Sequence, residues 1–488
     1  MVQAEGAAPI MLSTGVPNLD LVLGGGLQRH NTYLFAGPAG AGKSVLSQQI
    51  AFHRARQGER VLMVTGLDEP HQNLLEHLRT FRFADLAMIG PLIETVSLVP
   101  FLEQPVSEKI SVLRRTVVNV RPELVIVDGL RSLEAFTGGQ QGLHHFIYGL
   151  TSWFAVEGIT LILTRDSSPS EMWSSPEHGL VDGVLVLQPY LVNGRLLRRL
   201  LVQKTRGQMH LPGLHSFTIN EDGITIWPRP QTTYLPADRP WSEARAAFGV
   251  PSLDAMLGGG LPQASATLLA TDPGADGTAL GLSFLAAGAE RGEPGLWVGF
   301  GAPHARLLGM AQHLGIDLAG PEARRQVSFL AVAPFELVAD EFADRMQRQV
   351  ADTGARRMVL DGAEVLESAL PGRAEARSFI AWLLQALPQQ GVTTLVTRQT
   401  SQGPGQNLLY AGEGLASLAE NVILIRHVRR QGELRRALAI LKMSSPGYDR
   451  SVRELVLERG GLHVDAPLGG EVGLPGSRAI GESVRGPA

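Results

Sequence analysis

The stretch TYLFAGPAGAGKS, residues 32–44, decides the fold. Its apolar start is typical of a buried strand, and residues 37–44 then read G-x-x-x-x-G-K-S. Such a loop directs backbone N–H groups at phosphate oxygens, and the helix that follows adds the positive end of its dipole. The pattern predicts a phosphate site formed by Gly37, Pro38, Ala39, Gly40, Ala41, Gly42, Lys43, Ser44 and Val45.

Three side chains have predictable roles in this site. We expect Lys43 to contact the β- and γ-phosphates of ATP and Ser44 to bind Mg²⁺ through its hydroxyl. Asp128 ends the apolar run LVIVDG, where a carboxylate can hold the metal ion and its water shell. ATP and Mg²⁺ are therefore the expected cofactors.

Hydrolysis also requires a group that orients and deprotonates water. Asp68 and Glu69 follow the predicted strand 60–66, which we expect to lie next to the phosphate-loop strand. They are the candidate bases. The alternative is that one of them only caps a helix that opens near His71.

The chain contains an internal repeat. GVPNLDLVLGGG at 15–26 and GVPSLDAMLGGG at 249–260 agree at nine of twelve positions, and later apolar runs recur in the same order. We expect a first domain over residues 1–226, a Pro-rich linker over 227–246, a second domain over 247–465 and a disordered tail over 466–488.

Strand-like and helix-like segments alternate in each copy. This alternation predicts an α/β fold in which a mainly parallel sheet carries helices on both faces. Residues 183–205 differ, because two β-rich runs flank Asn193 and Gly194, which predicts a hairpin at the end of the domain.

The composition excludes several classes of protein. With 43 basic and 47 acidic residues the net charge is −4, which argues against a strongly basic nucleic-acid binder, and the absence of cysteine excludes disulfides and thiolate metal sites. The chain has neither a signal-peptide pattern at its start nor an apolar run of membrane-spanning length, so we expect a cytoplasmic protein. Only four of the basic residues are lysines, and we attribute Lys109 to chance on a solvated surface.

The phosphate loop, the motif TGVPNLDLVLGGGL at 14–27 and the tandem copies resemble the KaiC-like ATPases of the RecA superfamily. The resemblance covers about residues 14–225 and 248–465. It implies two tandem RecA-like P-loop domains, hexameric rings and ATP bound between neighbouring subunits. The family carries two adjacent glutamates before a proline, whereas this chain has TGLDEP at 65–70, so the base stays ambiguous and turnover is expected to be slow.

The resemblance also implies residues that act on a neighbouring subunit. The family motif K-x-R-G appears at residues 204–207, which makes Lys204 and Arg206 candidates for stabilising γ-phosphate charge in the adjacent site. The alternative is a solvated basic strand.

The second copy has lost much of this chemistry. The alignment of the two copies places Thr278 over Lys43 and Ala279 over Ser44, while Asp272 replaces the first glycine and Asp276 adds a second negative charge. We expect no hydrolysis there and no autokinase activity like that of the family's second domain. Lys442 keeps the position of Lys204.

The sequence therefore predicts a KaiC-like ATPase that acts as an oligomeric regulator with an unknown protein partner, without a membrane or nucleic-acid partner. One alternative is a RecA-like DNA repair accessory that uses the basic clusters at 195–199 and 426–436. Another is a scaffold that binds ATP without hydrolysing it.

Overall fold

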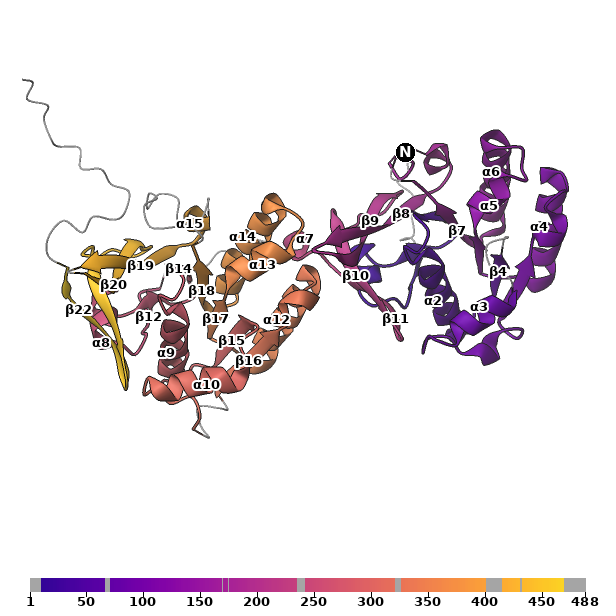
Figure 1. Ribbon diagram of the computed structural model, residues 1–488. Coiled ribbons are helices and arrows are strands. Elements are labelled where there is room, and N and C mark those ends of the chain that lie inside the picture. The colour runs from indigo at the N-terminus through magenta and orange to yellow at the C-terminus, as the bar shows by residue number, and fades with distance from the viewer. Residues whose placement is uncertain are drawn as a thin grey trace, which may run out of the picture. The chain divides into compact units, whose positions relative to one another are not determined.

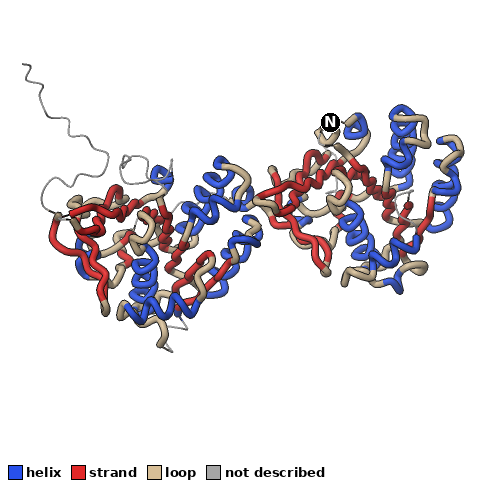
Figure 2. Tube along the Cα trace, viewed as in Figure 1, coloured by secondary structure: helices blue, strands red, loops and turns tan. Residues whose placement is uncertain are grey.

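The computed structural model describes residues 10–65, 71–168, 170–173, 175–234, 242–320, 326–400, 415–430 and 432–468. The chain divides into two compact units, Met1–Thr233 and Tyr234–Ala488. Each unit is built around one nine-stranded sheet with helices packed against it (Figures 1 and 2). We describe each unit by itself.

The sheet of the first unit has the order β11-β10-β9-β8-β3-β7-β6-β4-β5. The strands from β8 to β5 are parallel, and β9, β10 and β11 are added antiparallel. The strands are β3 (Thr32–Gly37), β4 (Val61–Thr65), β5 (Ile93–Ser97), β6 (Leu124–Asp128), β7 (Thr160–Asp166), β8 (Gly183–Val192), β9 (Arg195–Thr205), β10 (Leu214–Asn220) and β11 (Gly223–Trp227). The main helices are α2 (Lys43–Arg56), α3 (His71–Leu78), α4 (Val106–Val120), α5 (Leu130–Glu134) and α6 (Gln140–Glu157).

The second unit repeats this topology strand for strand, in the order β22-β21-β20-β19-β14-β18-β17-β15-β16. Its strands are β14 (Ala266–Thr271), β15 (Gly295–Phe300), β16 (Val327–Val332), β17 (Arg357–Asp361), β18 (Thr393–Gln399), β19 (Asn421–Arg430), β20 (Glu433–Lys442), β21 (Arg453–Glu458) and β22 (Gly461–Pro467). The main helices are α9 (Gly277–Glu290), α10 (His304–His313), α12 (Ala339–Thr353), α13 (Ala363–Ala369) and α14 (Arg373–Gln389).

These sheets confirm the predicted fold class. The predicted hairpin forms as β8 and β9 around Asn193 and Gly194. Two short elements, α7 (Pro230–Thr233) and β12 (Arg245–Ala246), lie inside the stretch predicted as a linker. The strand β22 continues two residues into the predicted tail, and residues 469–488 lie outside the described part of the chain.

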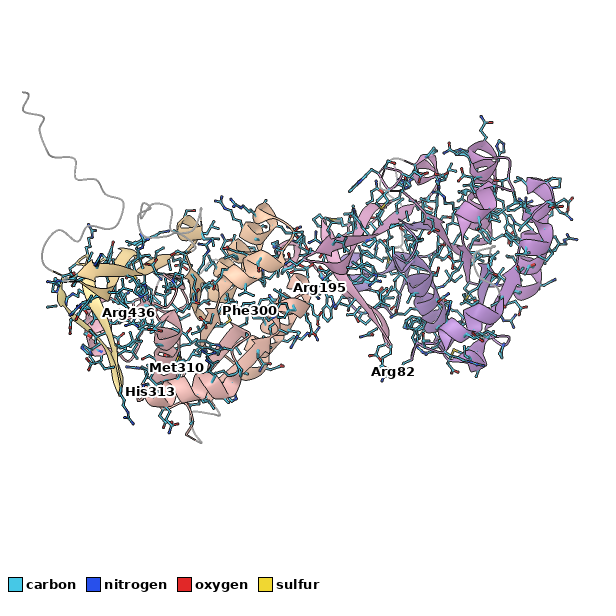
Figure 3. The ribbon with its side chains drawn as sticks, in the orientation of Figure 1. Arg82, Arg195, Phe300, Met310, His313 and Arg436 are labelled. Atoms are coloured by element: carbon cyan, nitrogen blue, oxygen red, sulfur yellow. The ribbon has the colours of Figure 1, made fainter. Side chains whose placement is uncertain are left out.

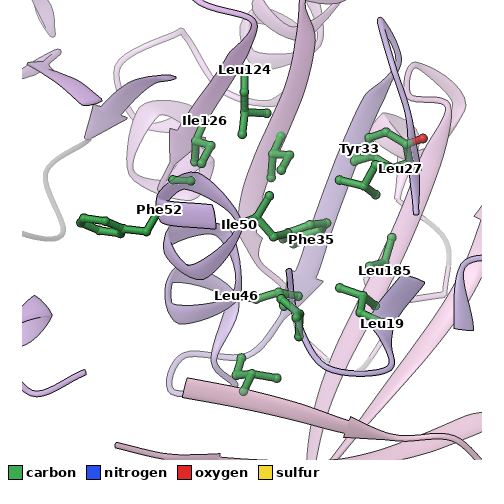
Figure 4. Packing of buried hydrophobic residues seen from close by; sticks show 14 of the residues in the cluster. Leu19, Leu27, Tyr33, Phe35, Leu46, Ile50, Phe52, Leu124, Ile126 and Leu185 are labelled. Carbon is green, nitrogen blue, oxygen red and sulfur yellow. The ribbon is translucent and has the colours of Figure 1, made fainter. Parts of the chain in front are cut away.

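The core of the first unit lies between α2 and the centre of the sheet. Leu46 and Ile50 of α2 pack among Phe35, Ile126 and Leu185 of the central strands, and all five are fully buried (Figure 4). Most residues of α2 are buried because the helix packs against β6 and β7 and also against β11. The helix that carries the phosphate loop is therefore held rigidly against the sheet.

The repeated GVPxLD motif packs against the helix that follows the phosphate loop in the first unit and against its counterpart α9 in the second. Asp20 accepts hydrogen bonds from the hydroxyl of Ser13 (2.7 Å) and the backbone N–H of Thr14 (2.9 Å). Its counterpart Asp254 instead accepts from two backbone N–H groups, those of Phe248 (2.7 Å) and Gly249 (3.0 Å). Gly15 has a φ of 66°, and a Cβ there would lie 2.0 Å from Cγ of His53 on α2. A side chain at this position would therefore push the motif off the helix.

Lys109 contradicts the surface position predicted for it, because its side chain is fully buried at the start of α4. Its ammonium donates to the carbonyl oxygens of Gln104 (2.8 Å) and Phe136 (2.6 Å). Burial lowers the pKa of Lys109. Only a long, slender side chain with several donors can satisfy both carbonyls, which tie the start of α4 to the end of α5.

Candidate nucleotide-binding site

The predicted phosphate loop joins the end of β3 to the start of α2. Gly42 is the N-cap residue of α2, with a φ of 102°, and a Cβ there would lie 2.8 Å from Cδ1 of Ile219. Because Gly42 has no side chain, the helix begins at Lys43 with its N-terminal N–H groups facing open space. This geometry is suited to binding an anion.

The loop borders a cavity of about 400 Å³ at the carboxyl edge of the parallel strands. From the predicted set, the cavity is lined by Ala39, Gly40, Gly42, Lys43, Ser44, Val45 and Asp128. The other lining residues, which were not predicted from the sequence, are Thr65, His77, Gly129, Thr164, Asp166 and Ile219. The structure thus joins the loop and the predicted metal-side carboxylate in one cavity.

Lys43 is held by two groups of the first unit. Its ammonium donates to the carbonyl oxygen of Pro38 (2.9 Å) and forms an ion pair with Oδ1 of Asp166 (2.5 Å). Asp166 ends β7, the strand that pairs with β3 and places Gly37 opposite Asp166. Sequence reasoning missed this carboxylate because β7 is far from β3 in the chain; the strand-end position after an apolar run was the available signal.

Asp128 ends β6 and is oriented by Thr164 of the neighbouring strand β7. The hydroxyl of Thr164 donates to Oδ1 of Asp128, and the backbone N–H of Gly129 donates to that hydroxyl (3.0 Å). Among the described residues, no group of three or more His, Asp and Glu side chains could hold a metal ion. One hydroxyl from Ser44 and one carboxylate from Asp128 instead fit Mg²⁺, which completes its shell with water and phosphate oxygens.

Both candidate bases, Asp68 and Glu69, lie outside the described residues. Thr65 immediately precedes that segment at the end of β4, and it lines the cavity. The prediction that this strand lies next to the phosphate-loop strand is wrong, because β7 and β6 separate β4 from β3. A parallel sheet need not follow the order of the chain.

Lys204 and Arg206 lie toward the amino edge of the parallel strands, whereas the phosphate loop lies at their carboxyl edge. Lys204 pairs with Val184 of β8, and Val184 pairs with Leu34 of β3. Because Leu34 is three residues before Gly37, Lys204 lies about 10 Å from the level of Gly37, measured along the strands. Its ammonium donates to the carbonyl oxygens of His178 (2.8 Å) and Val181 (2.7 Å), and burial lowers its pKa. The described residues that line the cavity do not include either cation.

Arg206 is more exposed than Lys204. Its guanidinium lies 3.4 Å from Oδ1 of Asp182 and donates to the carbonyl oxygen of Gly179 (3.2 Å), and 57% of its side chain is exposed. Arg206 is thus largely exposed, and it is not among the described residues that line the cavity of its own unit.

One family of known proteins matches both units of the chain. The KaiC ATPase family matches residues 12–231 and 246–468. The chain belongs to the KaiC family of ATPases. It is 24% identical to the circadian clock oscillator protein KaiC of Picosynechococcus sp., over 93% of this chain and 89% of that protein. It is also 24% identical to the circadian clock protein KaiC3 of Synechocystis sp., over 97% of this chain and 95% of that protein.

The two KaiC domains of this chain align one residue differently from the sequence-based alignment. Helices α2 and α9 begin at Lys43 and Gly277, and their N-cap residues, Gly42 and Asp276, both have a positive φ. Gly277 is therefore the counterpart of Lys43, and Thr278 is the counterpart of Ser44. The second domain thus has Gly277 where the first has Lys43, and it keeps a hydroxyl, that of Thr278, where the first has Ser44.

Ion pairs within the second KaiC domain neutralise the two carboxylates of its loop. Asp276 pairs with Arg436 of β20 (2.6 Å), which Figure 3 labels, and Asp272 lies 3.4 Å from Arg426 of β19. Asp272 also accepts the backbone N–H of His427 (2.9 Å). The hairpin of the second domain thus contacts the loop directly.

Asp361, the counterpart of Asp128, is half-buried at the end of β17 in the second KaiC domain. The hydroxyls of Thr397 (2.6 Å) and Thr278 (3.1 Å) donate to its carboxylate. Burial raises the pKa of Asp361, and the two hydrogen bonds only partly oppose this rise. The folded domain therefore binds this proton more tightly than the unfolded chain does, so the stability that it contributes is lost as the pH rises through the folded-state pKa.

We expect Asp361→Asn to stabilise the second domain at neutral pH, because an amide never ionises. The melting temperature should rise by about 3 °C at pH 7, for a gain of roughly 1 kcal/mol, and by less near pH 4. Scanning calorimetry of the full chain measures this difference. Asp352→Asn, at an exposed position on α12, is the matched control, and an equal effect of both variants would contradict the burial argument.

None of the helices in the described part of the chain combines the length and the apolar character that a transmembrane span needs.

Proposed function

We propose that this KaiC-family protein binds and hydrolyses ATP at one site per chain, in its first domain, and acts as an oligomeric regulator. The observation that carries the proposal is the cavity in which Lys43, Ser44 and Asp128 meet at the N-terminus of α2. This combination supplies a cation, a metal-binding hydroxyl and a carboxylate to one triphosphate.

Each of these groups would act on a particular charge. Lys43 would bind the β- and γ-phosphates, and the N–H groups of the loop would accept the remaining oxygens. Ser44 and Asp128 would hold Mg²⁺, which neutralises charge on the phosphates when it is bound. Asp68 or Glu69, just beyond Thr65 at the cavity, would orient the attacking water, and turnover would be slow because their spacing departs from the family pattern.

The second domain would neither bind nor hydrolyse ATP productively. It has Gly277 in place of the cation, and Asp272 and Asp276 place negative charge along the loop. Their pairing with Arg426 and Arg436 supports this proposal, because the basic side chains near the loop are already engaged. Autokinase activity is accordingly not part of the proposed function.

The positions of Lys204 and Arg206 support a site that is shared between subunits. Both lie toward the amino edge of the strands, whereas the phosphate loop lies at the carboxyl edge. A cation there can reach phosphate only in a neighbouring chain, which suits a closed ring with repeated head-to-tail contacts. We propose a cytoplasmic homo-oligomer, with six subunits as in the family pattern, that presents its ATP-dependent state to a regulatory protein.

A DNA repair role receives less support from the basic clusters. Arg435 pairs with Glu433 (2.7 Å) and Glu454 (3.1 Å), and Arg199 stacks on Tyr190 at 4.2 Å. These arginines are thus engaged within their own domains, whereas DNA binding uses cations that are available to phosphates.

Titration calorimetry with a non-hydrolysable ATP analogue and Mg²⁺ tests the proposed function, together with phosphate release from ATP. We expect one analogue bound per chain and slow release of phosphate. Two bound analogues would contradict the inactive second domain. Binding without any phosphate release would instead favour the ATP-gated scaffold.

A further inference from the structure

We propose that Asp166 is a positioning residue that sets the affinity of the first domain for nucleotide by holding Lys43 until phosphate displaces it. This inference rests on the proposed function, because it concerns the same loop. It identifies the carboxylate of Asp166 as an anion of the protein that competes with the phosphates of ATP for Lys43.

The contact between Lys43 and Asp166 is the first observation. The ammonium lies 2.5 Å from Oδ1 of Asp166, and only 7% of the Lys43 side chain is exposed, against 39% for Asp166. Both residues line the cavity of the phosphate loop. An incoming phosphate that binds Lys43 therefore competes with a carboxylate that is already in hydrogen-bond contact with it.

The surroundings of Asp166 show that its backbone is fixed. Its main chain pairs with Gly37 in the sheet, and its carbonyl oxygen accepts a hydrogen bond from Arg131 (3.3 Å). The preceding residue, Arg165, is buried and forms an ion pair with Glu177. With the backbone held on both sides, release of Lys43 needs only a rotation of the partly exposed carboxylate toward solvent.

The second domain provides an internal comparison. Gln399 is the counterpart of Asp166, since it lies opposite Thr271 just as Asp166 lies opposite Gly37. The two preceding residues are the same in both domains, with Thr164 and Arg165 matched by Thr397 and Arg398. The carboxylate is thus present where the loop has a lysine and absent where the loop has Gly277. The difference points to a role with Lys43 rather than a role in the strand.

The test is equilibrium binding of a non-hydrolysable ATP analogue with Mg²⁺ to the full chain, combined with the kinetics of ATP hydrolysis. Asp166→Asn keeps the size of the side chain and removes its charge. We expect the dissociation constant and KM to fall about three- to tenfold, a moderate effect because the pair is partly exposed, while kcat stays within about twofold. Asp166→Glu restores the charge and should return the affinity toward that of the wild type.

Glu171→Gln is the matched control. Glu171 lies in the same segment, but among the described residues its ion pairs are with Arg131 (3.3 Å) and Arg165 (3.8 Å) and not with Lys43. We expect this variant to bind the analogue as the wild type does. An equal gain in affinity from Glu171→Gln would show a general effect of surface charge and would overturn the inference.

Two further results would also overturn it. One is an affinity of Asp166→Asn that equals or falls below that of the wild type. The other is unchanged affinity with a collapse of kcat, which would assign Asp166 to the attacking water instead. In both cases the wild type still binds and hydrolyses ATP, so the proposed function stands. A wild type that binds no analogue would overturn the proposed function and this inference together.

Discussion

Replacing Lys43 with alanine is expected to reduce phosphate release by at least about 100-fold and to weaken binding of the ATP analogue strongly. The substitution removes the ammonium at the start of α2, and it also leaves the carboxylate of Asp166 facing the phosphates without its partner. The loss should therefore exceed that of a single phosphate contact. Calorimetry and a phosphate-release assay on the purified variant measure both effects.

Two further variants sharpen this prediction. Thr278→Ala alters the loop of the second domain at the position equivalent to Ser44 and should leave nucleotide binding unchanged. The double variant Lys43→Ala with Asp166→Asn should recover part of the lost affinity, because it removes the repulsion but not the missing contact. Full hydrolysis by Lys43→Ala would contradict the assignment of the site.

Arg206→Ala is expected to lower the hydrolysis rate by about 10³-fold while the affinity for ATP changes only a few-fold. An arginine that stabilises charge in the transition state contributes to kcat more than to ground-state binding. Arg206 is exposed and lies away from the cavity of its own unit, so this loss should arise in the neighbouring site.

A mixing experiment separates action between chains from action within one chain. In a ring formed from equal amounts of Lys43→Ala and Arg206→Ala, about a quarter of the interfaces combine an intact loop with an intact arginine. We therefore expect phosphate release to rise from near zero to about a quarter of the wild-type rate. No recovery in mixed assemblies, with both variants folded and assembled, would rule out the shared site.

Much of the fold could be predicted from local signals. The apolar run before Gly37 and the loop that follows predict a strand and a helix, and both elements are present. The repeat of GVPxLD has a physical reason that the sequence did not reveal, namely the close approach of Gly15 to His53 on α2. Asp128 was found because strand ends in a parallel sheet share one edge.

Other features depended on the order of strands in space. Asp128 directly follows the apolar run LVIV, whereas Thr164 and Arg165 separate Asp166 from the run LIL. Only the sheet shows that β7 lies beside β3 and that Asp166 therefore contacts Lys43. The sequence-based alignment of the two loops was wrong by one residue, because it matched Lys43 with Thr278 and not with Gly277. The backbone uses a positive φ at Gly42 and Asp276, and this conformation, not composition, defines the equivalent positions.

The burial of the lysines has a practical consequence for chemical labelling. Lys109 is fully buried, Lys43 is 7% exposed and Lys204 is half-buried, whereas the side chain of Lys442 is exposed even though its amine donates to the carbonyl oxygen of Ala419 (2.6 Å). Reagents that acylate lysine amines should therefore modify the native protein mainly at Lys442. Since the chain has no cysteine, an engineered thiol gives a second, orthogonal attachment point. Two dyes can then be placed on one chain to follow its assembly by energy transfer.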